Sequence, residues 1–232
     1  MLATLINALA IVAGSCIGLV LKKGLSKRFE TAIFTAAGIT TVVIAIQMAL
    51  KTGHILAFAL ALILGGLVGT AIKIEDAVLS LGERLKNRFA RGEEGGTFAL
   101  GFLNASVLYC AGAMAIVGSF KAGTEGDYSI ILTKSILDGT ISVLFASAMG
   151  VGVAFSAISV LVYQGLLTLA SGWVKPYVSP LMLSEITGIG GALVLMIGLN
   201  LLDIKKLKTG DFLPALIFMV IFVLAMPFVT FL

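Results

Sequence analysis

Four polar residues in the second half of the chain interrupt long apolar stretches. Lys134 and Asp138 are four positions apart, so a helix would place both on one face. Gln164 and Glu185 interrupt the two apolar stretches that follow. A polar or ionisable side chain inside a membrane segment is costly, and such residues often mark the path of an ion, a proton or a substrate. We therefore predict that these four residues line an ion or substrate pathway.

The expected role of each residue follows from its depth. Asp138 lies about 14 Å from the start of its apolar stretch, near the middle of a bilayer core about 30 Å thick. There its carboxylate would bind a cation or a proton, with Lys134 as its gate or counter-ion. Glu185 is expected near the outer end of its stretch, where it would recruit cations. Residues 188–191 include three glycines and could unwind to offer backbone groups to a ligand, as broken helices do in transporters.

A structural interpretation of the same residues stays open. Lys134 and Asp138 can neutralise one another without any substrate. Glu185 can lie among lipid headgroups and be solvated there. Gln164 and Asn104 are of the type that joins transmembrane helices by hydrogen bonds.

Enzymatic chemistry has little support in the sequence. The only histidine, His54, lies in a short loop. A single histidine gives little support to a zinc site or to a histidine-based catalytic triad. Asp138 and Glu185 alone could form a pair of catalytic acids, but we expect them at different depths. Nucleotide-binding glycine motifs with strand context do not occur, which excludes ATP-driven transport by this chain alone. We expect no enzymatic activity and no cofactor. Cys16 and Cys110 form no metal-ligand pattern, and whether a metal binds elsewhere stays open.

The composition identifies the surroundings of the chain. Of its 232 residues, 59% are hydrophobic and 12% are charged, and the mean hydropathy is +1.12. Soluble domains are about 45–50% apolar and about 25% charged, so the charges are too few to cover a 24.1 kDa globule. The excess apolar surface must face a lipid bilayer. The net charge of +4 comes from basic residues in short loops without interleaved aromatic residues, so we exclude a nucleic-acid partner.

A transmembrane helix needs about 20 mainly apolar residues. We predict an all-α fold, a polytopic transmembrane helix bundle of about eight spans in a single integral membrane domain over residues 1–232. The predicted spans are residues 2–21, 31–50, 55–73, 97–119, 129–148, 150–172, 181–201 and 211–231. The fifth and sixth spans are divided near Gly150, because one helix over both would be about twice as long as the bilayer is thick. Two full spans and a re-entrant pair both stay open.

The basic residues test this topology, because cytoplasmic loops of membrane proteins collect Lys and Arg. With eight spans, only Lys51, Lys121 and Lys175 fall on one side of the membrane. The residues on the other side are Lys22, Lys23, Lys27, Arg28, Lys73, Arg84, Lys86, Arg88, Arg91, Lys205, Lys206 and Lys208. That side is predicted to be cytoplasmic, and both termini extracytoplasmic. The first span has no basic segment before it, so we interpret it as a retained helix and not as a signal peptide.

Residues 74–92, between the third and fourth spans, combine an apolar stripe with a charged face. The apolar residues recur at three- and four-residue spacing, the period of an amphipathic helix. They are Ile74, Val78, Leu81, Leu85 and Phe89. We predict a helix in the cytoplasmic interface of the membrane, and a helical extension of the third span is equally open.

Glycines at four-residue spacing predict close helix packing. Gly14 and Gly18 in the first span, and Gly65 and Gly69 in the third, form two Gly-x-x-x-Gly motifs. Such motifs let helix backbones approach closely in a membrane. The two motifs are separated by a constant difference in residue number, which fits either a duplication or shared packing chemistry. The motifs would serve internal packing or a dimer contact, and a homodimer is the default expectation because two-fold assemblies are the commonest.

Motifs along the whole chain resemble one family. They are Leu108-Tyr-Cys-Ala-Gly-Ala-Met-Ala-Ile-Val-Gly-Ser119, Lys134-Ser-Ile-Leu-Asp-Gly139, Tyr163-Gln-Gly-Leu-Leu-Thr168 and Gly198-Leu-Asn-Leu-Leu-Asp-Ile-Lys-Lys206, with Gly14 to Gly18 and Leu81-Gly-Glu83 upstream. In this order they resemble the YdfK/YqgA-type bacterial membrane proteins, the domain of unknown function 554. The chain departs from the family pattern at Ala113, where the family has Gly-Pro. The loss of that proline removes one cause of a kink in the fourth span.

The resemblance implies a multi-pass protein of the bacterial cytoplasmic membrane, of a kind often labelled a transporter, without an established substrate. With the buried polar residues, it leads us to expect a transporter or channel. This protein would move a small ion or solute through a polar cavity that opens outward, coupled to a cation or a proton. A second class of function stays open, namely a non-transporting dimeric membrane subunit or sensor whose buried polar pairs are structural.

Overall fold

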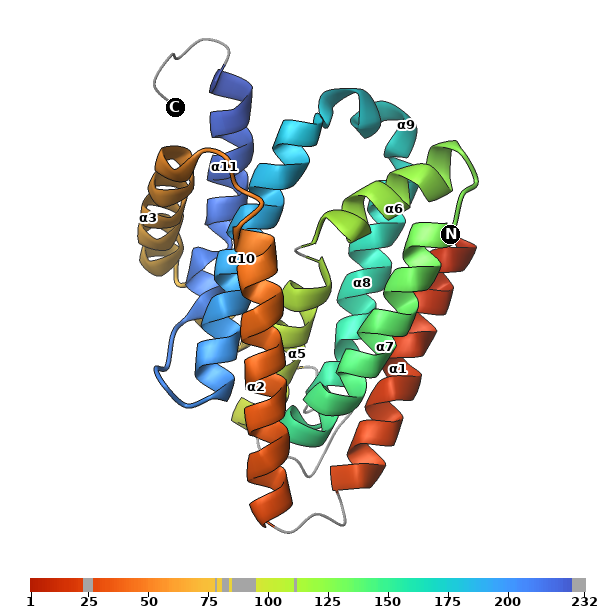
Figure 1. Ribbon diagram of the computed structural model, residues 1–232, viewed down its shortest axis with the longest axis vertical. Helices are drawn as coiled ribbons and strands as arrows, with labels where there is room; N and C mark the ends of the chain where they lie inside the picture. Colours follow the sequence, from red (N-terminus) through yellow and green to blue (C-terminus); the bar gives the residue numbers. More distant parts are fainter. Residues whose placement is uncertain (23–26, 78, 81–83, 85–94, 111, 227–232) are drawn as a thin grey trace. The chain divides into compact units, whose positions relative to one another are not determined.

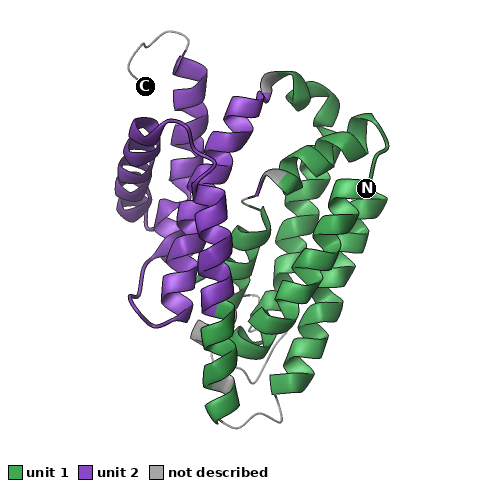
Figure 2. Cartoon of the chain, viewed as in Figure 1, with its two compact units in different colours: residues 1–37, 79–110, 114–177 green, residues 38–78, 111–113, 178–232 purple. Residues whose placement is uncertain are grey.

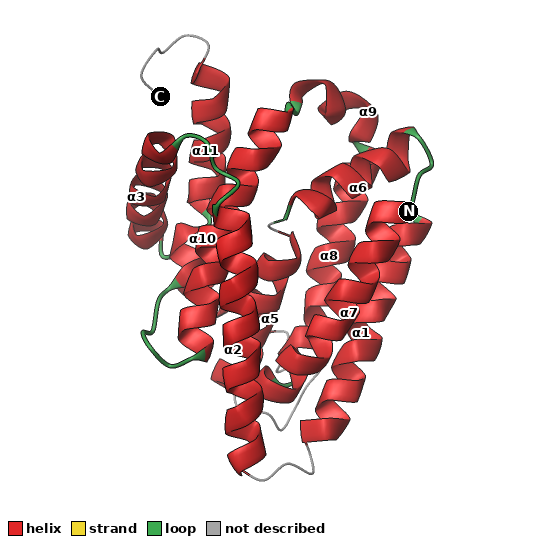
Figure 3. Ribbon diagram, in the orientation of Figure 1, coloured by secondary structure: helices red, strands yellow, loops and turns green. Residues whose placement is uncertain are grey.

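The computed structural model describes residues 1–22, 27–77, 79–80, 84, 95–110 and 112–226, and the regular structure within these residues is helical (Figure 1, Figure 3). The longer helices are α1 (Leu2–Lys22), α2 (Lys27–Ala49), α3 (Ile55–Ile72), α5 (Gly95–Cys110), α6 (Ala113–Thr124), α7 (Ser129–Met149), α8 (Gly152–Leu169), α10 (Pro180–Leu201) and α11 (Pro214–Ala225). The short elements are α9 (Ser171–Val174) and the 3₁₀ helices η1 (Lys175–Tyr177) and η2 (Thr209–Phe212). The predicted all-α polytopic fold is confirmed.

Two compact units make up the chain (Figure 2). Unit 1 comprises residues 1–37, 79–110 and 114–177, and its main helices are α1, α5, α6, α7 and α8. Unit 2 comprises residues 38–78, 111–113 and 178–232, with the second half of α2 and with α3, α10 and α11. The single membrane domain over residues 1–232 stays a prediction.

Six helices are long and apolar enough to cross a membrane, or seven spans if one bent pair is included. The six correspond to the first, second, third, fifth, sixth and seventh predicted spans. The fourth predicted span is the bent pair, in which Phe98–Cys110 and Met114–Thr124 are inclined at 61°. The chain therefore bends sharply here although Ala113 replaces the proline of the family pattern.

The eighth predicted span is shorter in the structure than in the prediction. Helix α11 has 12 residues, which extend about 18 Å, against a bilayer core of about 30 Å. The last predicted residues of this span, 227–231, lie outside the described residues. Most of the predicted amphipathic segment is also outside them, and its described residues 74–77 and 79–80 are helical.

Helices α7 and α8 are separate and are joined by a tight turn at Gly150. Gly150 has φ of +86°, a backbone conformation that glycine adopts without a steric penalty. The two helices have 21 and 18 residues, so each alone is long enough to cross a bilayer core.

In unit 1, α1 packs closely against α7. A Cβ atom on Gly14 would collide with the carbonyl oxygen of Gly139, and one on Gly18 with the carbonyl oxygen of Val143. Residue numbers rise together on the two helices, so α1 and α7 run parallel. The first Gly-x-x-x-Gly motif thus makes an internal contact.

Unit 1 has an end at which α1 and α7 begin and α8 ends, which we call its N-side. Ala3 of α1, Ala122 of α6 and Ile131 of α7 pack together there in a buried cluster. Helix α5 runs toward the N-side and stops at Cys110, and α6 continues obliquely from Ala113 (Figure 1).

In unit 2, α3 packs antiparallel to α11. A Cβ atom on Gly65 would collide with Ala215, and one on Gly69 with the carbonyl oxygen of Asp211. The second Gly-x-x-x-Gly motif is therefore also used inside the chain.

Helix α10 is continuous through residues 188–191, so the glycines that could unwind this span remain helical. A Cβ atom on Gly191 would collide with Ala45 and Ala49 of α2. The glycines therefore provide room for a neighbouring helix and expose no backbone groups.

Candidate functional site

Lys134 and Asp138 form an ion pair on the buried face of α7. The Lys134 ammonium donates to Oδ2 of Asp138, and each residue is only 5% exposed. Their spacing of four positions stacks them one turn apart on the helix, as predicted. The pair has no net charge, and its polar atoms face the interior of unit 1.

Two amide side chains from other helices complete the cluster. Asn7 of α1 donates from Nδ2 to Asp138 Oδ2 at 3.1 Å and to Gln164 Oε1 of α8 at 3.1 Å. Both amide residues are fully buried. We call Asn7, Lys134, Asp138 and Gln164 the polar cluster of unit 1, and it joins helices α1, α7 and α8.

Sequence analysis did not include Asn7 among the pathway residues. The signal that could have found it is its spacing from the glycine motif, because Asn7 precedes Gly14 by seven residues and Gly18 by eleven. These spacings place all three residues on one helix face, and Gly14 and Gly18 are the residues that pack against α7.

The Asp138 carboxylate determines the orientation of the two amides. If Asn7 were flipped, its carbonyl oxygen would face the carboxylate oxygen and the two would repel each other. With Nδ2 directed toward Asp138, Oδ1 of Asn7 and Nε2 of Gln164 are buried and have no hydrogen-bond partner within the described part of the chain. Buried polar groups are nearly always paired, so these two atoms need an explanation.

The last turn of α5 lies beside the ion pair. Tyr109, in the last turn of α5, bonds through its hydroxyl to Ser142 Oγ of α7 at 2.7 Å. The Lys134 ammonium lies 5.7 Å from the centre of the Tyr109 ring. The last carbonyl groups of a helix carry partial negative charge, so the end of α5 brings acceptors and an aromatic face close to the lysine.

Glu185, the fourth predicted pathway residue, belongs to unit 2. Its buried carboxylate accepts hydrogen bonds from the Thr52 hydroxyl and from the backbone N–H of Gly53 at 2.8 Å, and contacts His54 Nδ1 at 3.0 Å. The three partners form the loop between α2 and α3. The structure thus pairs Lys134 with Asp138 directly and links Gln164 to them through Asn7. Glu185 instead holds a loop in the other unit.

Comparison with known proteins identifies the family. The family described as "Protein of unknown function (DUF554)" matches residues 2–224. The chain belongs to this family. "Uncharacterized membrane protein YdfK" of Bacillus subtilis (strain 168) is 34% identical, over 97% of each chain. "Uncharacterized protein YqgA" of Escherichia coli (strain K12) is 30% identical, over 96% of this chain and 93% of that protein. No solved structure matches the chain.

The DUF554 membership confirms the resemblance drawn from the motifs. The apolar helices and the similarity to a protein named as a membrane protein together establish a multi-pass membrane protein. Three of the matching motifs carry residues of the polar cluster or of the adjoining break, namely Tyr109, Lys134, Asp138 and Gln164.

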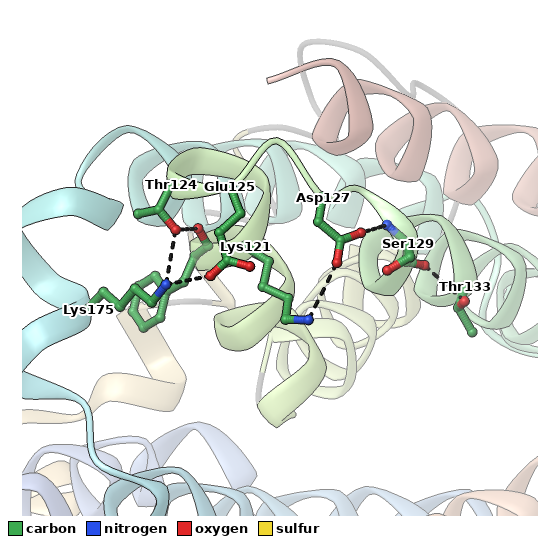
Figure 4. Close-up of polar contacts among 8 residues, drawn as sticks. Lys121, Thr124, Glu125, Asp127, Ser129, Thr133 and Lys175 are labelled. Atoms are coloured by element: carbon green, nitrogen blue, oxygen red, sulfur yellow. Dashed lines mark hydrogen bonds and ion pairs between the residues drawn. The ribbon is translucent and has the colours of Figure 1, made fainter.

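In this DUF554 protein, the N-side of unit 1 carries an exposed polar network (Figure 4). Lys175 of η1 donates to Glu125 at 2.6 Å and to Thr124 at 3.2 Å. Asp127 accepts from the backbone N–H of Ser129 at 2.9 Å and pairs with Lys121 at 3.4 Å. The network ties the end of α6 to the start of α7 and to η1. The bond from Lys175 lowers the pKa of Glu125, and the bonds from Ser129 lower the pKa of Asp127.

A second buried group of acids lies in unit 2, where α3 ends. Glu75 accepts from the backbone N–H of Gly210 at 2.5 Å, and Asp211 accepts from the backbone N–H of Glu75 at 2.9 Å. Burial raises the pKa of Glu75. This reciprocal arrangement fastens the segment after α3 to η2. Within the part of the chain that the structure describes, His, Cys, Asp and Glu side chains do not gather in groups of three that could hold a metal ion.

Proposed function

We propose that this DUF554 protein is a membrane transporter or channel for a small ion or solute, in which Asp138 takes up and releases a cation or a proton. The observation that carries the proposal is a Lys–Asp pair on the buried face of an apolar helix, bonded to the amide of Asn7 and beside the end of α5. Charged groups and helix breaks at such depth are typical of transport sites, because each is costly unless it serves binding or movement.

The geometry supports a simple working cycle. When a cation or a proton neutralises Asp138, the carboxylate no longer attracts Lys134. The ammonium then has other acceptors within reach, since the Tyr109 ring and the end of α5 lie beside it. A cation above an aromatic ring is stabilised by the negative face of the ring. Binding at Asp138 would thus move Lys134 toward the α5–α6 break and change the contact between α5 and α7.

Transport by reconstituted protein tests the proposal. Liposomes that contain the protein and ion-sensitive dyes would report fluxes of H⁺, Na⁺ and K⁺. A thermal-shift screen against ions and small metabolites would extend the search. A ligand that binds only the folded state raises the melting temperature of the protein. Asp138→Asn should abolish the flux that the wild-type protein shows. Full flux in this variant would exclude Asp138 from transport.

The double variant Asp138→Asn with Lys134→Met distinguishes a role in transport from a purely structural role of the ion pair, because it removes both charges together. A stable double variant without flux supports transport. A stable double variant with unchanged flux supports the structural interpretation. Lys121→Met with Asp127→Asn is the matched control, since this pair lies in the same unit but is exposed.

The alternative function is a non-transporting membrane subunit or sensor, with the polar cluster as a structural lock. The closed state of the cluster favours it, because Lys134 and Asp138 are 5% exposed and bond to each other. This alternative predicts that the protein binds no ion in the thermal-shift screen and that the double neutral variant behaves as the wild type does.

We further propose a bacterial cytoplasmic membrane location with both termini extracytoplasmic, and a homodimer. The asymmetry of Lys and Arg between the two sides supports the orientation. Since both Gly-x-x-x-Gly motifs are used inside the chain, a dimer would use other surfaces. Labelling of single introduced cysteines in intact cells tests the orientation, and the mass of the detergent-solubilised protein tests the dimer.

A further inference from the structure

Among the residues that the structure describes, five buried polar atoms of unit 1 have no hydrogen-bond partner. They are Oγ1 of Thr4, Oδ1 of Asn7, Oγ of Ser15, Oγ of Ser119 and Nε2 of Gln164. All five residues are 1% exposed or less. Buried polar atoms without protein partners are usually held by ordered water. Such atoms therefore indicate where water can reside inside unit 1.

Three of the unpaired atoms lie along one face of α1, and the other two belong to α6 and α8. Thr4, Asn7 and Ser15 are three, eight and eleven positions apart, which places them on one buried face. Thr4 and Ser15 are separated by about 16 Å along the helix axis, which is roughly half of a bilayer core. Gln164 bonds directly to Asn7.

Ser119 belongs to the N-side of unit 1. It stands one turn before Ala122, which packs with Ala3 and Ile131. Thr4 directly follows Ala3, so Ser119 and Thr4 flank the same small cluster. Thr4 and Ser119 therefore each place an unpaired hydroxyl next to this small cluster, at the N-side of unit 1.

The chemistry of these atoms favours water and a proton over a metal cation. A metal cation such as Ca²⁺ requires six or more oxygen ligands around one point, whereas these atoms are distributed along a helix. The Gln164 Nε2 group is a donor and would repel a cation. Hydroxyl groups both donate and accept, so a row of hydroxyls and water can pass a proton from one to the next.

We infer that Asp138 exchanges a proton with the N-side of unit 1 through water held by Thr4, Ser119, Asn7 and Gln164. The inference rests on the proposed function and specifies its ion as H⁺. In the uptake step a water-borne proton adds to the Asp138 carboxylate, the hydrogen bond from Lys134 is released, and the ammonium keeps its protons. The net charge of the Lys134–Asp138 pair then rises from zero to one.

The groups around Asp138 fit this step. The titratable groups that face it are Lys134 on its own helix and Tyr109 and Cys110 of α5. From α1 and α8 it faces the neutral amides Asn7 and Gln164. Lys134 is thus the cation that bonds to Asp138, and the partner that α1 supplies is a neutral amide.

Proton flux into liposomes with an entrapped pH-sensitive dye, driven by a potassium diffusion potential, tests the inference. Thr4→Val and Ser119→Ala each remove a hydroxyl of the route, and each should lower the proton flux by about fivefold, the effect of one lost hydrogen bond. Thr4→Ser keeps the hydroxyl and should keep the flux. Ser135→Ala is the matched control, because Ser135 is buried but bonds within α7 to the Ile131 carbonyl at 2.7 Å.

The outcomes separate this inference from the proposed function. If Asp138→Asn abolishes Na⁺, K⁺ or solute flux while the wild type moves no protons, the proton route is wrong and the proposed function stands. The route is also wrong if Thr4→Val and Ser119→Ala keep full proton flux and raise the melting temperature. These results would show that the two hydroxyls hold no water. If Asp138→Asn retains every flux, both proposals fail.

Discussion

Units 1 and 2 both bury acidic side chains, but the partners of these acids differ. In unit 1, Asp138 bonds to two side chains, Lys134 and Asn7. In unit 2, Glu185 and Glu75 accept from backbone N–H groups of Gly53 and Gly210. A side-chain partner can rotate away and return, whereas a backbone partner moves only with its loop. Glu185 also bonds to the side chains of Thr52 and His54, but these belong to the same loop as Gly53. We therefore expect the arrangement in unit 1 to be the one that can change, and the acids of unit 2 to fix loops.

The same glycine spacing also has different uses in the two units. Gly14 and Gly18 face a parallel helix, and Gly65 and Gly69 face an antiparallel one. A duplicated helix pair would keep the direction of its partner. Shared packing chemistry therefore explains the matching motifs better than a duplication does.

The largest effect is expected from Asp138→Asn, which leaves the buried Lys134 ammonium without its counter-charge. Removal of one partner of a buried ion pair costs about 3 kcal/mol or more of folding free energy. Adding Lys134→Met should recover most of this loss. Unfolding in detergent, followed by circular dichroism, measures both variants. If the single variant is as stable as the wild type, the pair is not the buried charge pair described here.

Gly14→Ala in unit 1 should destabilise the protein by about 2 kcal/mol, since the new methyl group would force α1 away from the Gly139 carbonyl. Gly165→Ala on α8 is the control, because the nearest atom to its Cβ is a Met1 methyl carbon at 3.5 Å. The control should be neutral or gain up to about 1 kcal/mol from helix propensity. Equal effects of the two variants would contradict the close packing of α1 on α7.

Glu185→Gln should lower the free energy of unfolding by about 2 kcal/mol, because an amide donor would replace one acceptor for Thr52, Gly53 and His54. Transport should stay at the wild-type rate, because the bonds of Glu185 go to the loop between α2 and α3 and not to the polar cluster. A stable variant with a large loss of flux would return Glu185 to the predicted pathway and weaken the contrast between the units.

The smallest effect concerns Glu75, whose pKa is raised by burial from its usual value of 4.5. A carboxyl with a raised folded-state pKa contributes stability that is fully present below pH 4.5 and is lost as the pH rises through the folded-state value. The melting temperature of the wild type should therefore fall from pH 5 to pH 7.5 by more than that of Glu75→Gln. Identical pH profiles for the two proteins would show that Glu75 does not titrate in this range.

The sequence predicts the spans well because each transmembrane helix satisfies its own backbone hydrogen bonds, so local hydropathy is sufficient to find it. The Lys134–Asp138 pair is likewise a local feature of one helix. The neighbours that a helix packs against, in contrast, are not specified by its local sequence. The bond from Asn7 to Gln164 joins residues 157 positions apart, and nothing in either neighbourhood specifies the other.

The remaining differences also have physical reasons. Without a proline at Ala113, hydropathy alone gives a continuous fourth span, whereas the structure has two helices inclined at 61° there. The glycines of α10 suggest flexibility by composition, but the neighbouring helix α2 fills the space beside them. Glu185 carries the same charge as Asp138. Only the residues around each carboxylate in space show that Glu185 holds a loop and that Asp138 belongs to the polar cluster.

The parallel pairing of α1 with α7 has a consequence for biosynthesis. Asn7 is translated before its carboxylate partner, which follows 131 residues later. During that interval the buried-face amide of α1 has no acceptor on α7. We therefore expect α1 to stay beside the translocation machinery until α7 and α8 emerge.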